Sequence, residues 1–459
     1  MSATNDLPVA VIGGGPIGLA AAAHLAARGM PVRLYEAGET VAANVMTWAH
    51  VRLFSPWRFN IDAAAHALLR ERGWQEPGAE ALPTGRELHD AYLAPLANAL
   101  AAQGIIETRA RVRSIARRGI DKVVSRERSR HPFALAIDAS GGERIDFARA
   151  VIDASGTWQN PNPLGASGVP AAGETQAADR IDYGIPDVLR AHRARHAGRH
   201  TLVIGAGHSA ANVLIDLARL AEDDARTRIT WAVRGRDLTR VFGGGDADRL
   251  AARGKLGSDL KRLVEAERLR LVTGFSAERV ERGERGVAVS GTVDGSAITL
   301  GPADRIVVAT GQRPDLSLTR ELRLDLDPWL ESPRALGPAI DPNVHSCGSV
   351  PPHGYRALAH PEPDYFAVGI KSYGRAPTFL MATGYEQVRS VAAYLAGDRA
   401  AADDVRLVLP ETGVCSVDFA PAEAADETCC GAAAAKDAMA GKQSGCGPAA
   451  GAPVPAAHG

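Results

Sequence analysis

Two glycine-rich phrases most strongly constrain what this chain can fold into. The first is VAVIGGGPIG, with Gly13, Gly15 and Gly18, and the second is TLVIGAGHSA, with Gly205, Gly207 and Ala210. Each phrase follows an apolar run with β-branched residues and precedes an alanine-rich helical stretch, which gives the order strand, turn, helix. One such pattern has low specificity, because glycine-rich turns are common. Two copies predict two dinucleotide-binding sites in one chain.

The end of the second strand in the first unit indicates which nucleotide part binds there. Residues 8–13 predict a buried parallel strand, and a helix follows to about Arg28, before Gly29. PVRLYEAG predicts the next strand, with Glu36 at its end. A carboxylate at this spacing from the glycines can accept hydrogen bonds from the ribose hydroxyls of an adenosine. The alternative is a solvated carboxylate at a strand end.

The corresponding position of the second unit holds an arginine. RITWAVRGRD predicts the second strand, with Arg234 at its end and Arg236 and Arg240 nearby. A guanidinium can pair bidentately with a ribose 2′-phosphate, which a carboxylate would repel. We therefore expect NADPH rather than NADH at this site. The alternative is a surface arginine that follows a strand.

Both units close with a similar phrase. RAVIDASGTW leads into Ser155-Gly156, and DRIVVATGQRPD leads into Thr310-Gly311. A glycine at a strand end lets backbone approach a bound nucleotide closely. Residues 287–298 alternate like short antiparallel strands, and TFLMATGYEQVRSVAAYL predicts a helix. The expected fold class is α/β, with two Rossmann-like, three-layer (ββα) dinucleotide-binding domains.

Composition excludes several classes of partner. The 459 residues carry a formal net charge of −1, which gives no electrostatic case for nucleic acid or an anionic membrane. The basic run from Arg109 to Arg130 is interrupted by acids, and we interpret it as a solvated face. The apolar N-terminus lacks a basic segment, so it is not read as a signal peptide. No long apolar run predicts a membrane span.

The cysteines lie toward the C-terminal end of the sequence. They are Cys347, Cys415, Cys429, Cys430 and Cys446, which is not the framework of a disulfide-bonded core. A reducing cytoplasm fits this usage best. From about Glu411 the composition shifts to alanine, glycine, proline and cysteine, which predicts a disordered tail.

The motifs together resemble those of the flavoproteins with two dinucleotide-binding domains. Within them the chain is similar to flavin-containing monooxygenase-like and N-hydroxylating proteins. In HVRLFSPW, HSCGSVPPHG and KSYGRAPTFLMATGYEQVRS it resembles bacterial flavoproteins found with arsenic-resistance genes, over roughly residues 8–412. The resemblance implies an FAD-binding domain at 1–165 and 336–412, an NADPH-binding domain at 166–335 and a tail at 413–459.

The resemblance also implies which residues bind each cofactor. Those expected to contact FAD are Gly13, Gly15, Pro16, Gly18, Glu36, Trp48, Val112, Ser155, Gly156, Gly369, Thr378 and Phe379. Those expected to contact NADPH are Gly205, Gly207, His208, Ser209, Ala210, Arg234, Thr310 and Gly311. Thr378 and Phe379 are expected to start the helix of the return segment. For Trp48 the alternative is plain core packing.

Three polar residues are the catalytic candidates. Lys371, Tyr373 and Arg375 lie beside the expected helix N-terminus in GIKSYGRAPTF. They are expected to stabilise the negative charge of the reduced flavin or to hold the nicotinamide amide. The alternative is that they only brace the loop. No metal site is expected.

Three functions stay open from the sequence. In the first, NADPH reduces FAD, and the reduced flavin uses O₂ to oxygenate a small soft nucleophile, a sulfur, nitrogen or As(III) centre. The F-x-G-x-x-x-H segment of such monooxygenases is incomplete here, since RIDYGIPDVLRAHRARH keeps only Gly184. In the second, the flavin reduces a thiol-bound metal or metalloid ion, or a disulfide, with the help of Cys429 and Cys430, because vicinal thiols favour As(III) or Hg(II). The third is a flavin-containing redox sensor or metalloid-binding protein.

Overall fold

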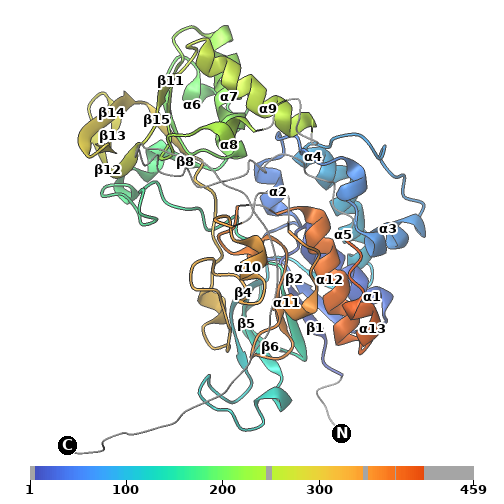
Figure 1. Cartoon of the computed structure of the whole chain (residues 1–459). Helices are drawn as coiled ribbons and strands as arrows, with labels where there is room; N and C mark the ends of the chain where they lie inside the picture. Colours follow the sequence, from blue (N-terminus) through green and yellow to red (C-terminus); the bar gives the residue numbers. More distant parts are fainter. Residues whose placement is uncertain (1–5, 244, 246–250, 345–349, 378, 408–459) are drawn as a thin grey trace, which may run out of the picture. The chain divides into compact units, whose positions relative to one another are not determined.

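Two parallel sheets organise the chain, and in each the strand before a glycine turn is central. Figure 1 shows how the helices and strands are arranged. The computed structural model describes residues 6–243, 245, 251–344, 350–377 and 379–407. The first sheet has the order β16-β7-β1-β2-β3 and the second has the order β11-β10-β9-β15-β8. The strands of the first are β1 (Val9–Ile12), β2 (Val32–Tyr35), β3 (Ile106–Glu107), β7 (Ala150–Asp153) and β16 (Tyr365–Ala367). Those of the second are β8 (Ile181–Tyr183), β9 (His200–Ile204), β10 (Arg228–Ala232), β11 (Arg270–Val272) and β15 (Arg305–Val308).

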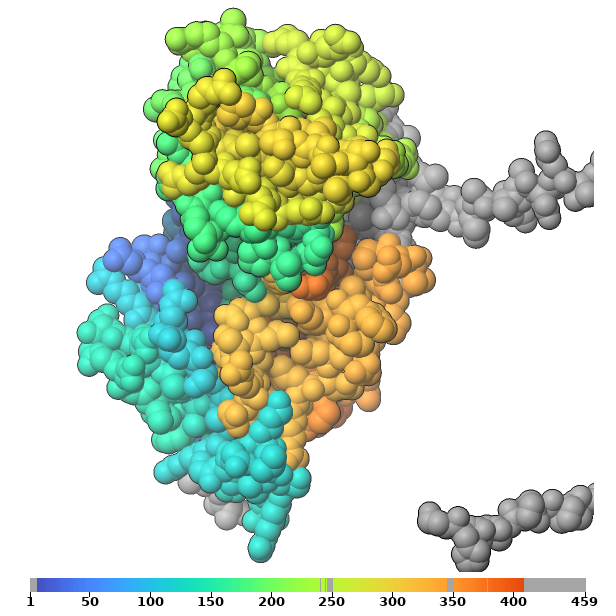
Figure 2. All heavy atoms as spheres, turned by 90° about the vertical axis from the view of Figure 1, so that its left-hand side faces the viewer, coloured from blue at the N-terminus to red at the C-terminus, as the bar shows by residue number. Residues whose placement is uncertain are grey.

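Each parallel sheet carries a three-stranded antiparallel sheet on one face. The first consists of β4 (Arg111–Arg117), β5 (Phe133–Ala139) and β6 (Gly142–Ala148), and the second of β12 (Ser276–Gly283), β13 (Gly286–Val293) and β14 (Ser296–Ala303). Figure 2 shows the second of these sheets in yellow on the molecular surface. The alternation in residues 287–298 predicted part of this sheet, and the equivalent strands between residues 111 and 148 were not expected.

Helices cover the opposite faces. The longer ones are α1 (Pro16–Ala27), α3 (Ala63–Arg70), α5 (Ala94–Ala101), α7 (His208–Asp223), α9 (Ala251–Glu265) and α12 (Met381–Leu395). The shorter ones are α2 (Ala43–Thr47), α4 (Gly85–Leu88), α6 (Arg193–His196), α8 (Thr239–Phe242), α10 (Gly337–Ile340), α11 (Tyr355–Leu358) and α13 (Arg399–Asp403). Helix α12 packs beside α1, although the two are far apart in the sequence (Figure 1). Among the residues described, no helix is long and apolar enough to cross a membrane.

Burial on both faces explains the continuous apolar strands. In β1, Val9 and Val11 pack against the helices, while Ala10 and Ile12 pack against β4–β6. In β9, Val203 packs with α7, and its neighbours Leu202 and Ile204 pack with β12–β14. A strand covered on both sides has no solvent-facing positions, so it reads as one apolar run. The three-layer α/β fold class is confirmed.

The return of the chain to its first sheet is visible in β16. Its residues pair in parallel with β7, at Tyr365 with Val151 and Phe366 with Ile152. The boundaries at residues 165, 335 and 412 stay predictions. Helix α12 begins at Met381 rather than at Thr378 or Phe379, because Leu380 is extended and its carbonyl is the first that the helix uses. Thr378 lies outside the described residues.

The reading of the basic run as a solvated face was wrong for two arginines. Arg117 on β4 and Arg128 in a short 3₁₀ turn are 3% and 6% exposed. Both bind Glu362, which precedes β16: the Arg117 Nε lies 2.8 Å from Oε1, and the Arg128 terminal nitrogen lies 2.9 Å from Oε2. The backbone N–H of Arg323 also donates to Oε2. This cluster joins the first antiparallel sheet to the return segment.

We expect Glu362→Gln to lower the free energy of unfolding by about 3–5 kcal/mol, because it leaves two buried guanidinium groups without their carboxylate. Chemical denaturation followed by circular dichroism measures this. The matched control is Glu127→Gln, which removes an exposed partner of Arg130 and should change stability little. Equal losses for the two variants would contradict a structural role for the buried cluster.

The same variant tests a pH dependence. Burial alone raises the pKa of Glu362, but hydrogen bonds from Arg128, the Arg323 backbone and Arg117 together hold it below the usual glutamate value of about 4.5. Its stabilising contribution is therefore complete above about pH 4.5 and is lost as the pH falls through the folded-state pKa. The variant should lack this part of the acid destabilisation.

Candidate functional site

The first glycine turn joins β1 to α1 through close backbone contacts. Gly13 has a φ of +98°, and a Cβ there would lie 2.6 Å from the carbonyl oxygen of Ala154. A Cβ on Gly18 would lie 1.8 Å from the carbonyl oxygen of Gly13. Close backbone packing within the chain therefore requires glycine at both positions, whether or not a ligand is bound.

Gly15 is different, since nothing in the chain requires a glycine there. It is the N-cap of α1 with an extended backbone, and no atom lies within 4 Å of a Cβ built on it. Pro16 occupies the first helical position, where an N–H is not needed. No side chain caps this helix end, so its backbone N–H groups and dipole are available to an anion. The turn therefore fits a nucleotide pyrophosphate.

Glu36 follows β2 and braces the same turn. Its carboxylate oxygens accept the backbone N–H groups of Gly14 and Gly38, each at 2.6 Å. The side chain is half-buried. It lies at the carboxyl end of the sheet, where a ligand of such a fold binds. Its expected contact with ribose stays a prediction.

The second turn repeats the geometry of the first. Gly205 has a φ of +139°, and its Cβ would lie 2.2 Å from the carbonyl oxygen of Ala309. Gly207 is the extended N-cap of α7, and no atom lies within 4 Å of a Cβ built on it. His208 and Ser209 begin α7, and Ala210 is fully buried in it. The N-terminus of α7 has no side-chain cap either, so its N–H groups are also available to an anion.

Arg234 is exposed beyond the end of β10. One of its terminal nitrogens donates to the carbonyl oxygen of Ala166 at 2.8 Å. Arg236 pairs with Asp294, so its charge is already compensated. The side chain of Arg240 lies outside the described part of the structure. Of the three expected cations, Arg234 is therefore the best candidate for a 2′-phosphate contact.

The two Ser/Thr-Gly strand ends continue into segments that pair with each other. The Thr310 hydroxyl donates to the carbonyl oxygen of Asn162 at 3.0 Å, and the Asn162 amide donates back to the Thr310 carbonyl oxygen at 2.9 Å. The Asn162 N–H also donates to the carbonyl oxygen of Gly311. The segments after Gly156 and Thr310 therefore lie side by side. The expected contact of Thr310 and Gly311 with NADPH stays a prediction.

The return segment reaches the first turn through Gly369. With a φ of +67°, its Cβ would lie 3.1 Å from the side chain of Ile17, the second residue of α1. The ring of Phe379 lies 5.2 Å from that of Tyr373, edge to face. A Cβ on Gly384 of α12 would also meet Ile17 and Phe379. Gly369 and Phe379 therefore lie close to the first turn, and their contacts with FAD stay predictions.

The three catalytic candidates have three different surroundings. The Lys371 ammonium is buried, 2.7 Å from Asp153 Oδ2. Tyr373 is also buried, and burial raises the pKa of its hydroxyl. Arg375 is exposed and binds Glu331. The structure does not bring them together on one point, and their catalytic roles stay predictions.

Of the other FAD candidates, Trp48 lies near the Ser155-Gly156 strand end, and the contact of Val112 with FAD stays a prediction. The Trp48 ring is 6.4 Å from that of Trp158, which follows Ser155-Gly156, and it packs on Gly85. Val112 lies on β4, paired with Ile137 in the antiparallel sheet.

The sequence reasoning missed two polar residues of this region. Asp153 ends β7, and Tyr365 on β16 donates a hydrogen bond to it at 3.0 Å. The signal for Asp153 was present, since it is a charged residue directly after the apolar run AVI. Phe54, from HVRLFSPW, was also missed, and its ring lies 5.1 Å from that of His208.

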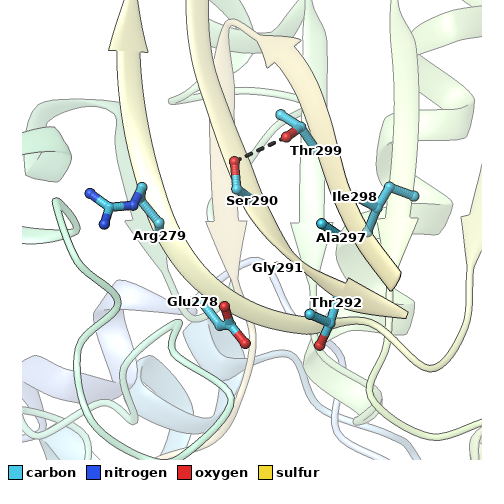
Figure 3. Close-up of a pocket in the computed structure, with 8 residues that line it drawn as sticks. All are labelled: Glu278, Arg279, Ser290, Gly291, Thr292, Ala297, Ile298 and Thr299. Atoms are coloured by element: carbon cyan, nitrogen blue, oxygen red, sulfur yellow. Dashed lines mark hydrogen bonds between the residues drawn. The ribbon is translucent and has the colours of Figure 1, made fainter. Parts of the chain in front are cut away.

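A hollow elsewhere is not part of these turns (Figure 3). It is lined by Glu278, Arg279, Ser290, Gly291, Thr292, Ala297, Ile298 and Thr299. Figure 3 shows the hydrogen bond between the Ser290 and Thr299 hydroxyls across β13 and β14, at 3.0 Å. None of these residues belongs to a glycine turn or to an end of a parallel strand. We assign it no role in nucleotide binding.

All five cysteines fall outside the described residues. The tail and the pair Cys429 and Cys430 therefore have no structural account. Within the described ranges, no group of three or more His, Cys, Asp or Glu residues has the geometry to hold a metal ion.

Solved structures share this fold at low sequence identity. Bacillithiol disulfide reductase Bdr (YpdA) from Bacillus cereus matches with a TM-score of 0.62 and 17% identity, over 85% of this chain and 99% of its own. The FAD-bound cadaverine monooxygenase DfoA from Erwinia amylovora matches with a TM-score of 0.62 and 13% identity, over 90% of this chain and 98% of its own. The ornithine N-hydroxylase KtzI from Kutzneria sp. 744 matches with a TM-score of 0.56 and 15% identity, over 86% of this chain and 99% of its own. A search of curated proteins gave no match.

A family match covers both turns. Residues 7–350 match the family described as pyridine nucleotide-disulphide oxidoreductase. The matched stretch includes both glycine turns and both Ser/Thr-Gly strand ends. The resemblance to flavoproteins with two nucleotide-binding domains is confirmed at this level, and the link to arsenic-resistance genes stays a prediction. The chain belongs to the pyridine nucleotide-disulphide oxidoreductase family and is an oxidoreductase.

Proposed function

We propose that this protein uses NADPH to reduce FAD and then transfers oxygen from O₂ to a small soft nucleophile, a sulfur, nitrogen or As(III) centre. One observation carries the proposal of two nucleotides. Gly15 and Gly207 are both extended N-caps with no atom within 4 Å of a Cβ, although neither needs to be glycine for the fold. Close approach of a ligand to the backbone explains both.

The residue that follows the second strand of each unit supports the assignment of FAD to the first glycine turn and of NADPH to the second. Glu36 at the first turn suits the adenosine ribose of FAD, and Arg234 at the second suits the 2′-phosphate of NADPH. Bound FAD would supply the hydride acceptor and the reaction with O₂. The chain's part is to hold the pyrophosphate on the N-terminus of α1 and to shape the surroundings with Trp48, Ser155 and Gly369.

The cysteine positions favour oxygenation over disulfide reduction. A thiol must reach the flavin to exchange electrons with it, and the sequence has no cysteine before Cys347. The adjacent Cys429 and Cys430 support a second candidate, a reductase of a thiol-bound metalloid or disulfide. We propose a cytoplasmic location, from the cysteine usage alone.

The deciding measurement follows NADPH oxidation and O₂ uptake together, with and without a thioether, an amine or As(III). We expect O₂ uptake that rises with one of these nucleophiles. NADPH oxidation that needs As(III) or a disulfide but no O₂ would contradict oxygenation and favour the reductase. A variant lacking residues 414–459 serves as the control, since only the reductase depends on its cysteines.

We expect Gly15→Ala to abolish FAD binding, because its methyl group occupies the approach to the pyrophosphate. The fold should tolerate it, at a cost below about 1 kcal/mol, since the backbone is extended and no chain atom is near. Flavin absorbance and circular dichroism of the purified protein check both statements. The matched Gly207→Ala should keep the flavin and lose NADPH binding. A Gly15→Ala protein with a full complement of FAD would argue against the site.

We expect Arg234→Ala to raise the KM for NADPH far more than that for NADH, because it removes a charged hydrogen-bond partner of the 2′-phosphate. The loss is about 1–3 kcal/mol, or roughly 5- to 150-fold. Steady-state kinetics with both nucleotides measure it. Arg236→Ala is the control, since that arginine is paired with Asp294. Equal changes in the KM for NADPH and for NADH would contradict the assignment of Arg234 to the 2′-phosphate.

A further inference from the structure

Asp153 is a fully buried carboxylate at the end of β7, and each of its oxygens accepts two hydrogen bonds. Oδ1 accepts the Ser155 hydroxyl at 2.6 Å and the Ser155 N–H at 3.1 Å. Oδ2 accepts the Lys371 ammonium at 2.7 Å and the Tyr365 hydroxyl at 3.0 Å. The carboxylate therefore fixes the start of the Ser155-Gly156 turn.

Lys371 reaches the same turn from the return segment. It lies in a 3₁₀ turn, Gly369–Tyr373, that follows β16. Its side chain is 1% exposed, and its ammonium also donates to the Ser155 hydroxyl oxygen at 2.9 Å. The Ser155 hydroxyl thus accepts from Lys371 and donates to Asp153. Two segments far apart in the sequence hold one hydroxyl group in place.

The two opposite charges have a joint electrostatic consequence. A buried charge without its partner is strongly unfavourable, whereas the pair brings no net charge to the strand end. Lys371 is therefore not available as a free cation for a reduced flavin. If either partner is neutralised, an uncompensated charge remains beside Ser155, in surroundings where water screens little.

We propose that Asp153 and Lys371 form a charge-compensated pair that positions the Ser155-Gly156 turn against bound FAD and sets the reduction potential of its flavin. The proposal rests on the proposed function, which puts FAD at the first glycine turn. Lys371 and Asp153 are then positioning residues that act through Ser155, and Tyr365 completes the shell of the carboxylate.

The test measures the midpoint potential of the FAD-loaded, full-length protein by reduction in equilibrium with a redox dye. Reduced flavin carries more negative charge than oxidised flavin, so nearby negative charge disfavours reduction. Lys371→Met leaves the Asp153 carboxylate uncompensated and should shift the potential to more negative values. Asp153→Asn leaves the Lys371 ammonium and should shift it to more positive values. The double variant should return most of the way to the unaltered potential.

Two further variants separate charge from folding. Lys371→Arg keeps the charge and should keep the potential near its unaltered value, so it carries the test together with Asp153→Asn if Lys371→Met does not fold. Glu362→Gln removes another buried carboxylate of the same half of the chain. It should lower stability and leave the potential unchanged.

Opposite signs for the two single variants support the pair. Shifts in the same direction, or none, overturn it, since a structural loss alone has no reason to change sign with charge. The FAD dissociation constant of the unaltered protein, followed by flavin fluorescence, distinguishes this from a failure of the proposed function. Absence of FAD binding there contradicts the proposed function itself, whereas normal binding with the wrong shifts contradicts only the pair.

Discussion

Backbone contact between each glycine turn and the end of a neighbouring strand is the constraint on which both nucleotide-binding halves depend. Gly13 lies against the carbonyl of Ala154, and Gly205 against that of Ala309. Because no side chain intervenes, each helix starts at the carboxyl edge of its sheet and directs its N-terminus toward the adjacent Ser/Thr-Gly strand end. Glu36 and Asp153 lie at the same carboxyl edge, because each of them ends or directly follows a strand of the first sheet.

Buried ion pairs then fix how the return segment joins the first sheet. Glu362 binds Arg117 and Arg128 just before β16, and Lys371 binds Asp153 just after it. Apolar packing alone allows a strand to slip by two residues without turning its core face outward. A slip would separate these charges in the interior, at a high cost. The two clusters therefore specify the register that brings Gly369 to Ile17.

The sequence predicted the features that local chemistry determines. The glycine turns, the end of α1 before Gly29 and the strand that leads into Ser155-Gly156 follow from short spacings and from apolar runs covered on both faces. It did not predict the burial of Arg128, because its partner Glu362 is 234 residues away. The ion pair of Lys371 was missed for the same reason. A local pattern shows which residues are charged, but only the folded topology shows which of them meet.

The helix N-termini that would hold the cofactors consist of backbone groups, which do not depend on side-chain identity, and solved structures share this fold at 13–17% identity. The N-terminal turns of α1 and α12 meet at Ile17 and Gly384, and neither helix has a side-chain cap. Their dipoles offer positive potential that survives almost any change of side chain. With Lys371 compensated by Asp153, these helix ends still offer such potential near the first turn.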